Sequence, residues 1–120
     1  MNIALWIGQG MLAIVFVASG LLKSTQSKER MMAIGQTGVR DYPLGFIRFI
    51  ALCELLGAGG LIVPWATGIL PILTPLAAIG LSVVLIGAAR AHLRLHEPGN
   101  VAITLALLAL VAFVAFGRLR

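Results

Sequence analysis

The stretch Asn2–Leu22, NIALWIGQGMLAIVFVASGLL, contains no charged side chain. A helix of roughly 20 apolar residues crosses the hydrocarbon core of a bilayer, so this stretch is long enough to span one. It has no basic start and no convincing small-residue cleavage site, which distinguishes it from a secretory signal peptide. We therefore predict a retained transmembrane helix over about residues 2–22.

Three further apolar runs of near-spanning length predict helices over about residues 44–63, 69–92 and 101–117. The chain is 60% hydrophobic and 11% charged, which leaves a soluble protein too little polar surface to cover its core. No alternating barrel pattern is visible, and helices satisfy the hydrogen bonds of a lipid-exposed backbone. The sequence predicts an all-α fold, in which residues 1–120 form one membrane-embedded domain, an antiparallel bundle of four transmembrane helices.

The connections between these helices differ in length. The long one, Ser24–Pro43, contains a stretch at Lys28–Ile34 that suits either a short amphipathic helix at the membrane interface or a solvated loop. Pro64–Gly68 and Glu97–Asn100 combine helix-stopping residues and predict tight turns. Tight turns make neighbouring helices antiparallel.

The net charge of +5 comes from cations near helix ends, where lipid headgroups explain them, so we exclude a nucleic-acid partner. With four spans, seven of the nine cations fall on one side of the membrane: Lys23, Lys28, Arg30, Arg40, Arg48, Arg90 and Arg94. We expect that side, with the long loop 23–43, to be cytoplasmic and both termini to lie outside. Cys53 is the only cysteine, which excludes an intramolecular disulfide and a thiolate zinc cage.

Glu54 is the most informative residue. It lies ten residues into the second predicted helix, or about 15 Å along its axis, and so near the bilayer centre. A charge there costs roughly 2.5–3.5 kcal/mol, so the carboxyl is either protonated or paired with a cation. Arg48 is on a different helix face, which makes Lys23 or a residue of the third helix the better partner. Two interpretations stay open: a bond that fixes helix packing, or an acid that binds a ligand and handles protons.

A second polar cluster ends the third predicted helix: Arg90, His92, Arg94, His96 and Glu97. The two histidines are four residues apart and are expected to share a helical face. Two histidines and one acid are a weak metal signal, and basic groups suit a helix C-terminus, so we predict no metal site. The cluster instead favours a polar pocket formed by Glu54 with His92 and its neighbours.

Small residues accumulate in the second and third predicted helices, including Gly57, Gly59, Gly60, Gly80 and Gly87. Such residues let membrane helices pack closely. A glycine-rich surface also admits a flat ligand, and the sequence does not separate these two uses.

Short motifs follow one another along the predicted helices: Gly20-x-x-Lys23, Glu54-x-x-Gly57-Ala58-x-Gly60-Leu61-x-x-Pro64, Gly87-Ala88 before His92-Leu93-Arg94-x-x-Glu97, and Gly117-Arg118. Their order and spacing over nearly the whole chain resemble the DoxX-like family of small bacterial integral membrane proteins. The resemblance implies a multi-pass protein of the bacterial inner membrane, in which Lys23, Glu54, His92, Arg94 and Glu97 occupy recurrent polar positions. The wider group takes its name from a subunit of a thiosulfate:quinone oxidoreductase.

Two classes of function follow. In the first, the bundle binds a quinone or isoprenoid-like apolar ligand around Glu54, as an enzyme or as an oxidoreductase-associated subunit. Glu54 and His92 would then be catalytic groups for proton transfer, and the polar pocket would be completed by Lys23, Arg48, Arg90, Arg94 and Glu97. In the second class the protein is a structural or assembly partner without ligand chemistry.

The expected partners are the lipid bilayer, a membrane or soluble oxidoreductase subunit, and further copies of the chain. Quinone is the candidate cofactor. No nucleophile triad, phosphate loop or dinucleotide fingerprint is present in the sequence, which therefore leaves open whether the protein is an enzyme.

Overall fold

The computed structural model describes residues 2–34, 37–40 and 42–119. Four long helices dominate it: α1 (Asn2–Thr25), α3 (Leu44–Thr67), α4 (Leu73–Arg94) and α5 (Pro98–Leu119). Each is long and apolar enough to cross a membrane. A short helix, α2 (Lys28–Ala33), and a single 3₁₀ turn, η1 (Thr37–Val39), lie between α1 and α3. The described residues contain no strand, so the predicted all-α bundle of four membrane-spanning helices is confirmed.

The predicted turn at Pro64–Gly68 is wrong, because α3 runs through Pro64 to Thr67. Pro64 has no backbone N–H to bond the carbonyl of Gly60 one turn earlier. The Thr74 hydroxyl donates to that carbonyl at 2.9 Å instead, so the proline leaves no buried acceptor unsatisfied. The helix stops at Gly68, whose φ of 72° is the left-handed conformation of a helix C-cap.

The other helix limits also differ from those predicted. Leu70 has a φ of 48°, which breaks the helix there, and α4 therefore begins at Leu73 rather than at residue 69. The first helical residue of α5 is Pro98, a position where no intrahelical N–H is needed. The predicted turn at Glu97–Asn100 is thus confined to residues 95–97. Because α4 ends at Arg94 and His96 has a φ of 58°, the expected shared helical face of His92 and His96 is wrong.

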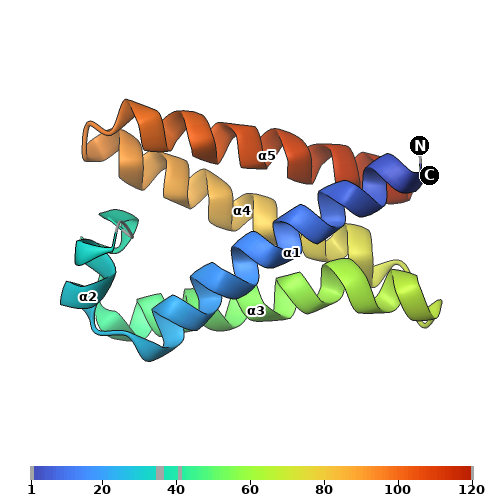
Figure 1. Ribbon diagram of the computed structural model, residues 1–120, viewed down its shortest axis with the longest axis horizontal. Coiled ribbons are helices and arrows are strands. Elements are labelled where there is room, and N and C mark those ends of the chain that lie inside the picture. Colours follow the sequence, from blue (N-terminus) through green and yellow to red (C-terminus); the bar gives the residue numbers. More distant parts are fainter. Residues whose placement is uncertain (1, 35–36, 41, 120) are drawn as a thin grey trace.

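The four long helices pack as two antiparallel pairs, α1 with α3 and α4 with α5. α3 also packs against α4, and α1 crosses the bundle from α5 to α3 (Figure 1). We call the end that holds both chain termini the termini end, and the end that holds α2 and the α4–α5 turn the loop end. The two pairs lie close together at the termini end and spread apart towards the loop end (Figure 1).

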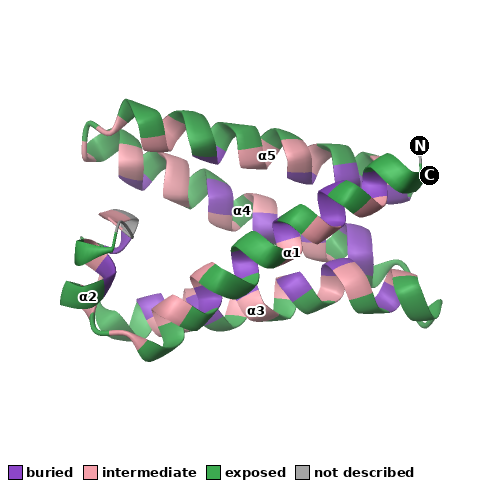
Figure 2. Ribbon diagram, viewed as in Figure 1, coloured by how far each residue is buried: buried purple, intermediate pink, exposed green. Residues whose placement is uncertain are grey.

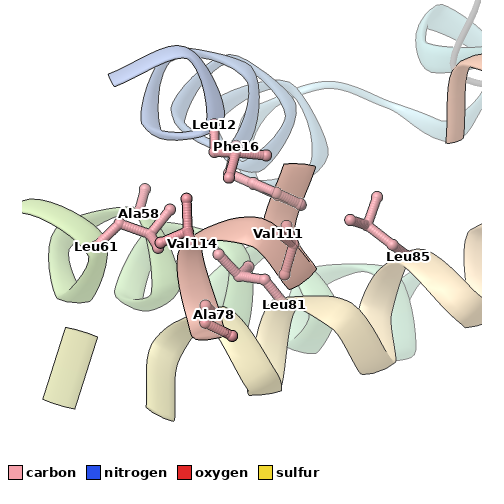
Figure 3. Close-up of a cluster of buried hydrophobic side chains, with 10 residues drawn as sticks. Leu12, Phe16, Ala58, Leu61, Ala78, Leu81, Leu85, Val111 and Val114 are labelled. Atoms are coloured by element: carbon pink, nitrogen blue, oxygen red, sulfur yellow. The ribbon is translucent and has the colours of Figure 1, made fainter. Parts of the chain in front are cut away.

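The buried side chains lie along the inner faces of the helices, and the outward faces are exposed (Figure 2). The main core joins all four long helices and is drawn in Figure 3: Leu12, Phe16, Ala58, Leu61, Ala78, Leu81, Leu85, Val111, Val114 and Ala115. Large apolar residues such as Ile3, Leu56 and Phe116 are 68–76% exposed. Lipid covers such a surface without cost, as expected for a membrane-spanning bundle.

The stretch that the sequence left open between a helix and a loop forms the helix α2. The Ser27 hydroxyl caps it by accepting a hydrogen bond from the backbone N–H of Arg30 at 3.1 Å. Met31 is fully buried and packs with Val39 and Ile47 in a small second core. The first turns of α3 therefore extend past the end of α1 to hold the α2–η1 segment.

Candidate functional site

A buried ion pair lies inside the bundle at the loop end. The Nζ atom of Lys23 is 2.7 Å from Oε1 of Glu54, and the Glu54 side chain is 2% exposed. Lys23 is the third residue from the end of α1, so the pair lies level with the last turns of that helix. Glu54 is the eleventh of the 24 residues of α3, so it lies near the middle of that helix, and its depth in the bilayer stays a prediction.

Two features bring Lys23 and Glu54 together. A Cβ atom on Gly20 would lie 3.1 Å from the backbone oxygen of Ala51, so the absence of a side chain there lets α1 approach α3 closely. Arg48 donates from Nη1 to the backbone carbonyl of Lys23, one of the carbonyls that the end of α1 leaves without an intrahelical partner. Arg48 thus holds the end of α1 in place.

Glu97 joins three segments at the same end. Its Oε1 atom is 2.9 Å from Nδ1 of His92 on α4 and accepts a hydrogen bond from the Thr37 hydroxyl of η1 at 2.8 Å. These two bonds hold the pKa of the Glu97 carboxyl below its ordinary value, with the bond from His92 the larger cause. Because an ionised carboxylate can only accept, His92 donates through Nδ1 and leaves Nε2 for another partner.

Two adjoining cavities surround these groups. One, of about 370 Å³, lies between α1, α4 and α5 and has Glu54, Asn100 and Thr104 in its wall. The other, of about 260 Å³, lies between α3, α4 and the α1–α3 connection and has Tyr42 and Phe46 in its wall. Their walls share four residues: Lys23, Val84, Ala88 and His92. Most of the other lining residues are apolar, so a few polar groups face a largely hydrophobic space.

The predicted site residues fall into three groups. Lys23, Glu54 and His92 line the cavities, and Glu97 orients His92 from outside them. Arg48 lines neither cavity and bonds the α1 backbone instead. Arg90 and Arg94 are exposed on α4 and also line neither cavity.

Tyr42 and Phe46 could not be identified from the sequence, since no pattern places the end of the long connection and the start of α3 beside α4. Asn100 and Thr104 could have been identified from the sequence as residues facing a polar site, because polar residues four apart in an apolar helix share one face. Within the described ranges, no group of three or more His, Cys, Asp or Glu side chains is arranged to hold a metal ion.

Comparison with known protein families identifies the chain over most of its length. A family model described as the DoxX-like family matches residues 7–114, a range that includes Lys23, Glu54, His92 and Glu97. No curated protein and no solved structure matches the chain. The family match confirms the resemblance drawn from the short sequence motifs.

Proposed function

This chain belongs to the DoxX-like family of membrane proteins, and we propose that it binds a quinone or isoprenoid-like ligand in the two cavities at the loop end. The observation that carries the proposal is the buried Lys23–Glu54 pair in the wall of a largely apolar cavity inside the bundle. A pair that served packing alone would be expected to be enclosed by apolar side chains. Lys23 and Glu54 instead lie in the wall of a cavity inside the bundle.

The cavities suit an apolar ligand in size and lining. Small-molecule pockets typically measure about 300–1,000 Å³ and combine apolar walls with a few polar groups. The larger of the two adjoining cavities, of about 370 Å³, falls in that range, and the other, of about 260 Å³, lies just below it. The aromatic rings of Tyr42 and Phe46, with centroids 5.3 Å apart, give a flat headgroup an apolar surface beside one cavity.

The polar groups suit the oxygens of a quinone or quinol. The Lys23 ammonium has three N–H donors and gives one to Glu54, so donors remain for a carbonyl oxygen. Among the described residues Glu54 is bonded through Oε1 only, and its second oxygen is available to accept from a quinol hydroxyl. His92, oriented by Glu97, presents its second ring nitrogen as a further proton acceptor or donor.

A role in quinone reduction requires a partner protein that supplies electrons. Reduction of a quinone to a quinol takes two electrons and two protons. Glu54 and His92 supply groups that exchange protons, but neither carries electrons. We therefore propose that the chain acts as a quinone-binding subunit associated with a membrane or soluble oxidoreductase that transfers the electrons.

The test is to purify wild type, Glu54→Gln and the control Glu29→Gln in a mild maltoside detergent and to identify bound small molecules by mass spectrometry. Glu29 is exposed on α2, so its variant removes the same charge away from the cavities. We expect wild type and Glu29→Gln to retain a quinone or other isoprenoid, and Glu54→Gln to retain about tenfold less, equivalent to about 1.4 kcal/mol. An empty wild-type protein, or equal retention in Glu54→Gln, contradicts the proposal.

A second candidate function is structural. The Lys23–Glu54 pair and the Arg48 bond join α1 to α3, and such bonds can serve to fix helix packing alone. In that case Glu54→Gln lowers the melting temperature while the bound small molecules stay unchanged.

We further propose that the protein resides in a bacterial inner membrane with the loop 23–43 in the cytoplasm. The excess of Lys and Arg at the loop end supports this orientation. Labelling of a cysteine introduced at Ser24 by a membrane-impermeant reagent tests it. Labelling only after the cells are permeabilised is the expected result, and labelling of intact cells contradicts it.

A further inference from the structure

A buried arginine lies at the termini end of the bundle, opposite the cavities. Arg118, in the last turn of α5, is 6% exposed. Its Nε atom donates to Oε1 of Gln9 at 2.7 Å, and its Nη1 atom donates to Oδ1 of Asn2 at 2.8 Å. Gln9 in turn donates to the backbone carbonyl of Leu61 on α3. The guanidinium is thereby fixed among three helices.

Two tryptophans flank the same guanidinium. The Arg118 Cζ atom lies 4.4 Å from the ring centroid of Trp65 and 5.4 Å from that of Trp6. Cation–π contacts of this kind attract a guanidinium but carry no countercharge. They also involve the faces of the rings, whereas the N–H donors of a guanidinium lie in its own plane. Stacking therefore leaves the hydrogen-bonding requirement of Arg118 unmet.

One nitrogen of Arg118 has no hydrogen-bond partner among the described residues. This atom, Nη2, is buried and forms no hydrogen bond within residues 2–34, 37–40 and 42–119. Among the described residues, no carboxylate lies within ion-pair distance of the guanidinium. A buried charge without a countercharge is costly, and an unsatisfied donor adds to that cost. A bound anion with an acceptor oxygen removes both costs together.

The surroundings favour a phosphate-type oxyanion at headgroup depth. Asn2, Trp65 and Arg118 all lie within the terminal turn of their helices, where phospholipid headgroups meet the bundle. The first backbone N–H groups of α1 have no intrahelical acceptors and add a positive potential beside Asn2. Asn2 is exposed and the two rings are half-buried, so the cluster reaches the surface at Asn2 and at the rings, beside the buried guanidinium.

We propose that Arg118, with Asn2 and the start of α1, binds a phosphate oxyanion at the termini end. Two sources share this chemistry, the phosphate of a membrane phospholipid and free inorganic phosphate. The proposal does not depend on the ligand proposed for the loop-end cavities.

Intrinsic fluorescence gives a readout that needs no variant, because Trp6 and Trp65 are the only tryptophans in the chain and both contact Arg118. Wild type in phosphate-free maltoside is titrated with phosphatidylglycerol, phosphatidylcholine or inorganic phosphate, and native mass spectrometry counts the retained lipid. We expect a saturable change in fluorescence and one retained phospholipid per chain. If inorganic phosphate produces the same change, the source is a free anion; if only the lipids do, it is a lipid headgroup.

Arg118→Lys is the matching variant, since it keeps the charge but loses the planar fork of donors, and Arg30→Lys is the control on the exposed surface of α2. We expect Arg118→Lys to weaken binding about tenfold or more, as for loss of a charged hydrogen bond, and Arg30→Lys to leave it unchanged. The proposal is overturned if wild-type fluorescence responds to none of the three additions. It is also overturned if folded Arg118→Lys binds as tightly as wild type.

Discussion

The two ends of this bundle use the same kinds of residue for opposite purposes. At the termini end, a Cβ added to Gly60 would lie 2.8 Å from Cβ of Ala77, so the glycine is needed for α3 and α4 to touch. At the loop end, a Cβ added to Gly87 would meet nothing within 4 Å, and this glycine lines a cavity. Small residues in a membrane helix therefore do not by themselves indicate packing. Their role depends on whether the helices converge or diverge at that level.

The polar residues at the two ends of the bundle also differ in what they contact. Gln9 and Arg118 at the termini end bond to each other and to the neighbouring helices. Lys23 and Glu54 at the loop end bond to each other and also border a cavity. The polar residues at the termini end thus join the helices, besides the oxyanion site proposed at its surface, whereas the loop end has space for a ligand between the helices. The predictions below test this division.

The largest expected effect is the loss of a side chain from the main core of the bundle. Leu12 is fully buried among all four long helices. We expect Leu12→Ala to destabilise the protein by about 3 kcal/mol, through lost contacts and the cavity that remains. Ile14, 73% exposed towards lipid on the same helix, is the control, and Ile14→Ala should cost less than about 1 kcal/mol. Unfolding by dodecyl sulfate in mixed micelles measures both. Equal losses would mean that the inner faces of the long helices do not form the stable core.

The next largest effect is expected when alanine replaces Gly60 at the termini end, and Gly87 at the loop end is the comparison. We expect Gly60→Ala to destabilise by about 2 kcal/mol, because the Cβ of Ala77 is rigidly placed and the helices must move apart. We expect Gly87→Ala to be neutral or to stabilise by about 0.5 kcal/mol, since alanine has the higher helix propensity and the added methyl group has room. The same unfolding assay applies. A destabilising Gly87→Ala would show that α4 is closely packed at the loop end in the membrane.

The smallest effect is a pH dependence at the loop end. Because hydrogen bonds from His92 and Thr37 lower the pKa of Glu97, they stabilise the fold above the ordinary carboxyl pKa. This contribution is lost as the pH falls through the lowered folded-state value. Hydrogen exchange at residues 37–40, corrected for the intrinsic rate, should therefore increase at acidic pH in wild type. In Glu97→Gln the corrected rates should be high and independent of pH, and a flat wild-type profile would contradict the account.

The fold could be predicted because it follows from the length and composition of the apolar runs. The ends of the helices could not, since they depend on contacts between helices. The sequence suggested a stop at Pro64, but the Thr74 hydroxyl, ten residues later, satisfies the carbonyl that the proline leaves free. α2 likewise depends on burial of Met31 against α3.

The candidate site was predictable where a charge interrupts an apolar run. Glu54 stands out for that reason, and Lys23 was one of its expected partners. Arg90 and Arg94 were expected in the pocket, yet they face outwards, because the sequence does not fix the rotation of α4. The sequence indicates Arg118 only as a cation near a helix end, since only the structure brings Gln9 and two tryptophans around it.

The most direct test of the central claim fills the cavities without altering a polar group. Ala88 lines both cavities, and Ala102 is exposed to lipid on α5. Wild type, Ala88→Trp and Ala102→Trp are purified in maltoside, and bound isoprenoids are counted by mass spectrometry beside the melting temperature. We predict that Ala88→Trp folds but loses the ligand, while Ala102→Trp keeps it. A folded Ala88→Trp that retains the wild-type amount of ligand would contradict a binding site at the loop end.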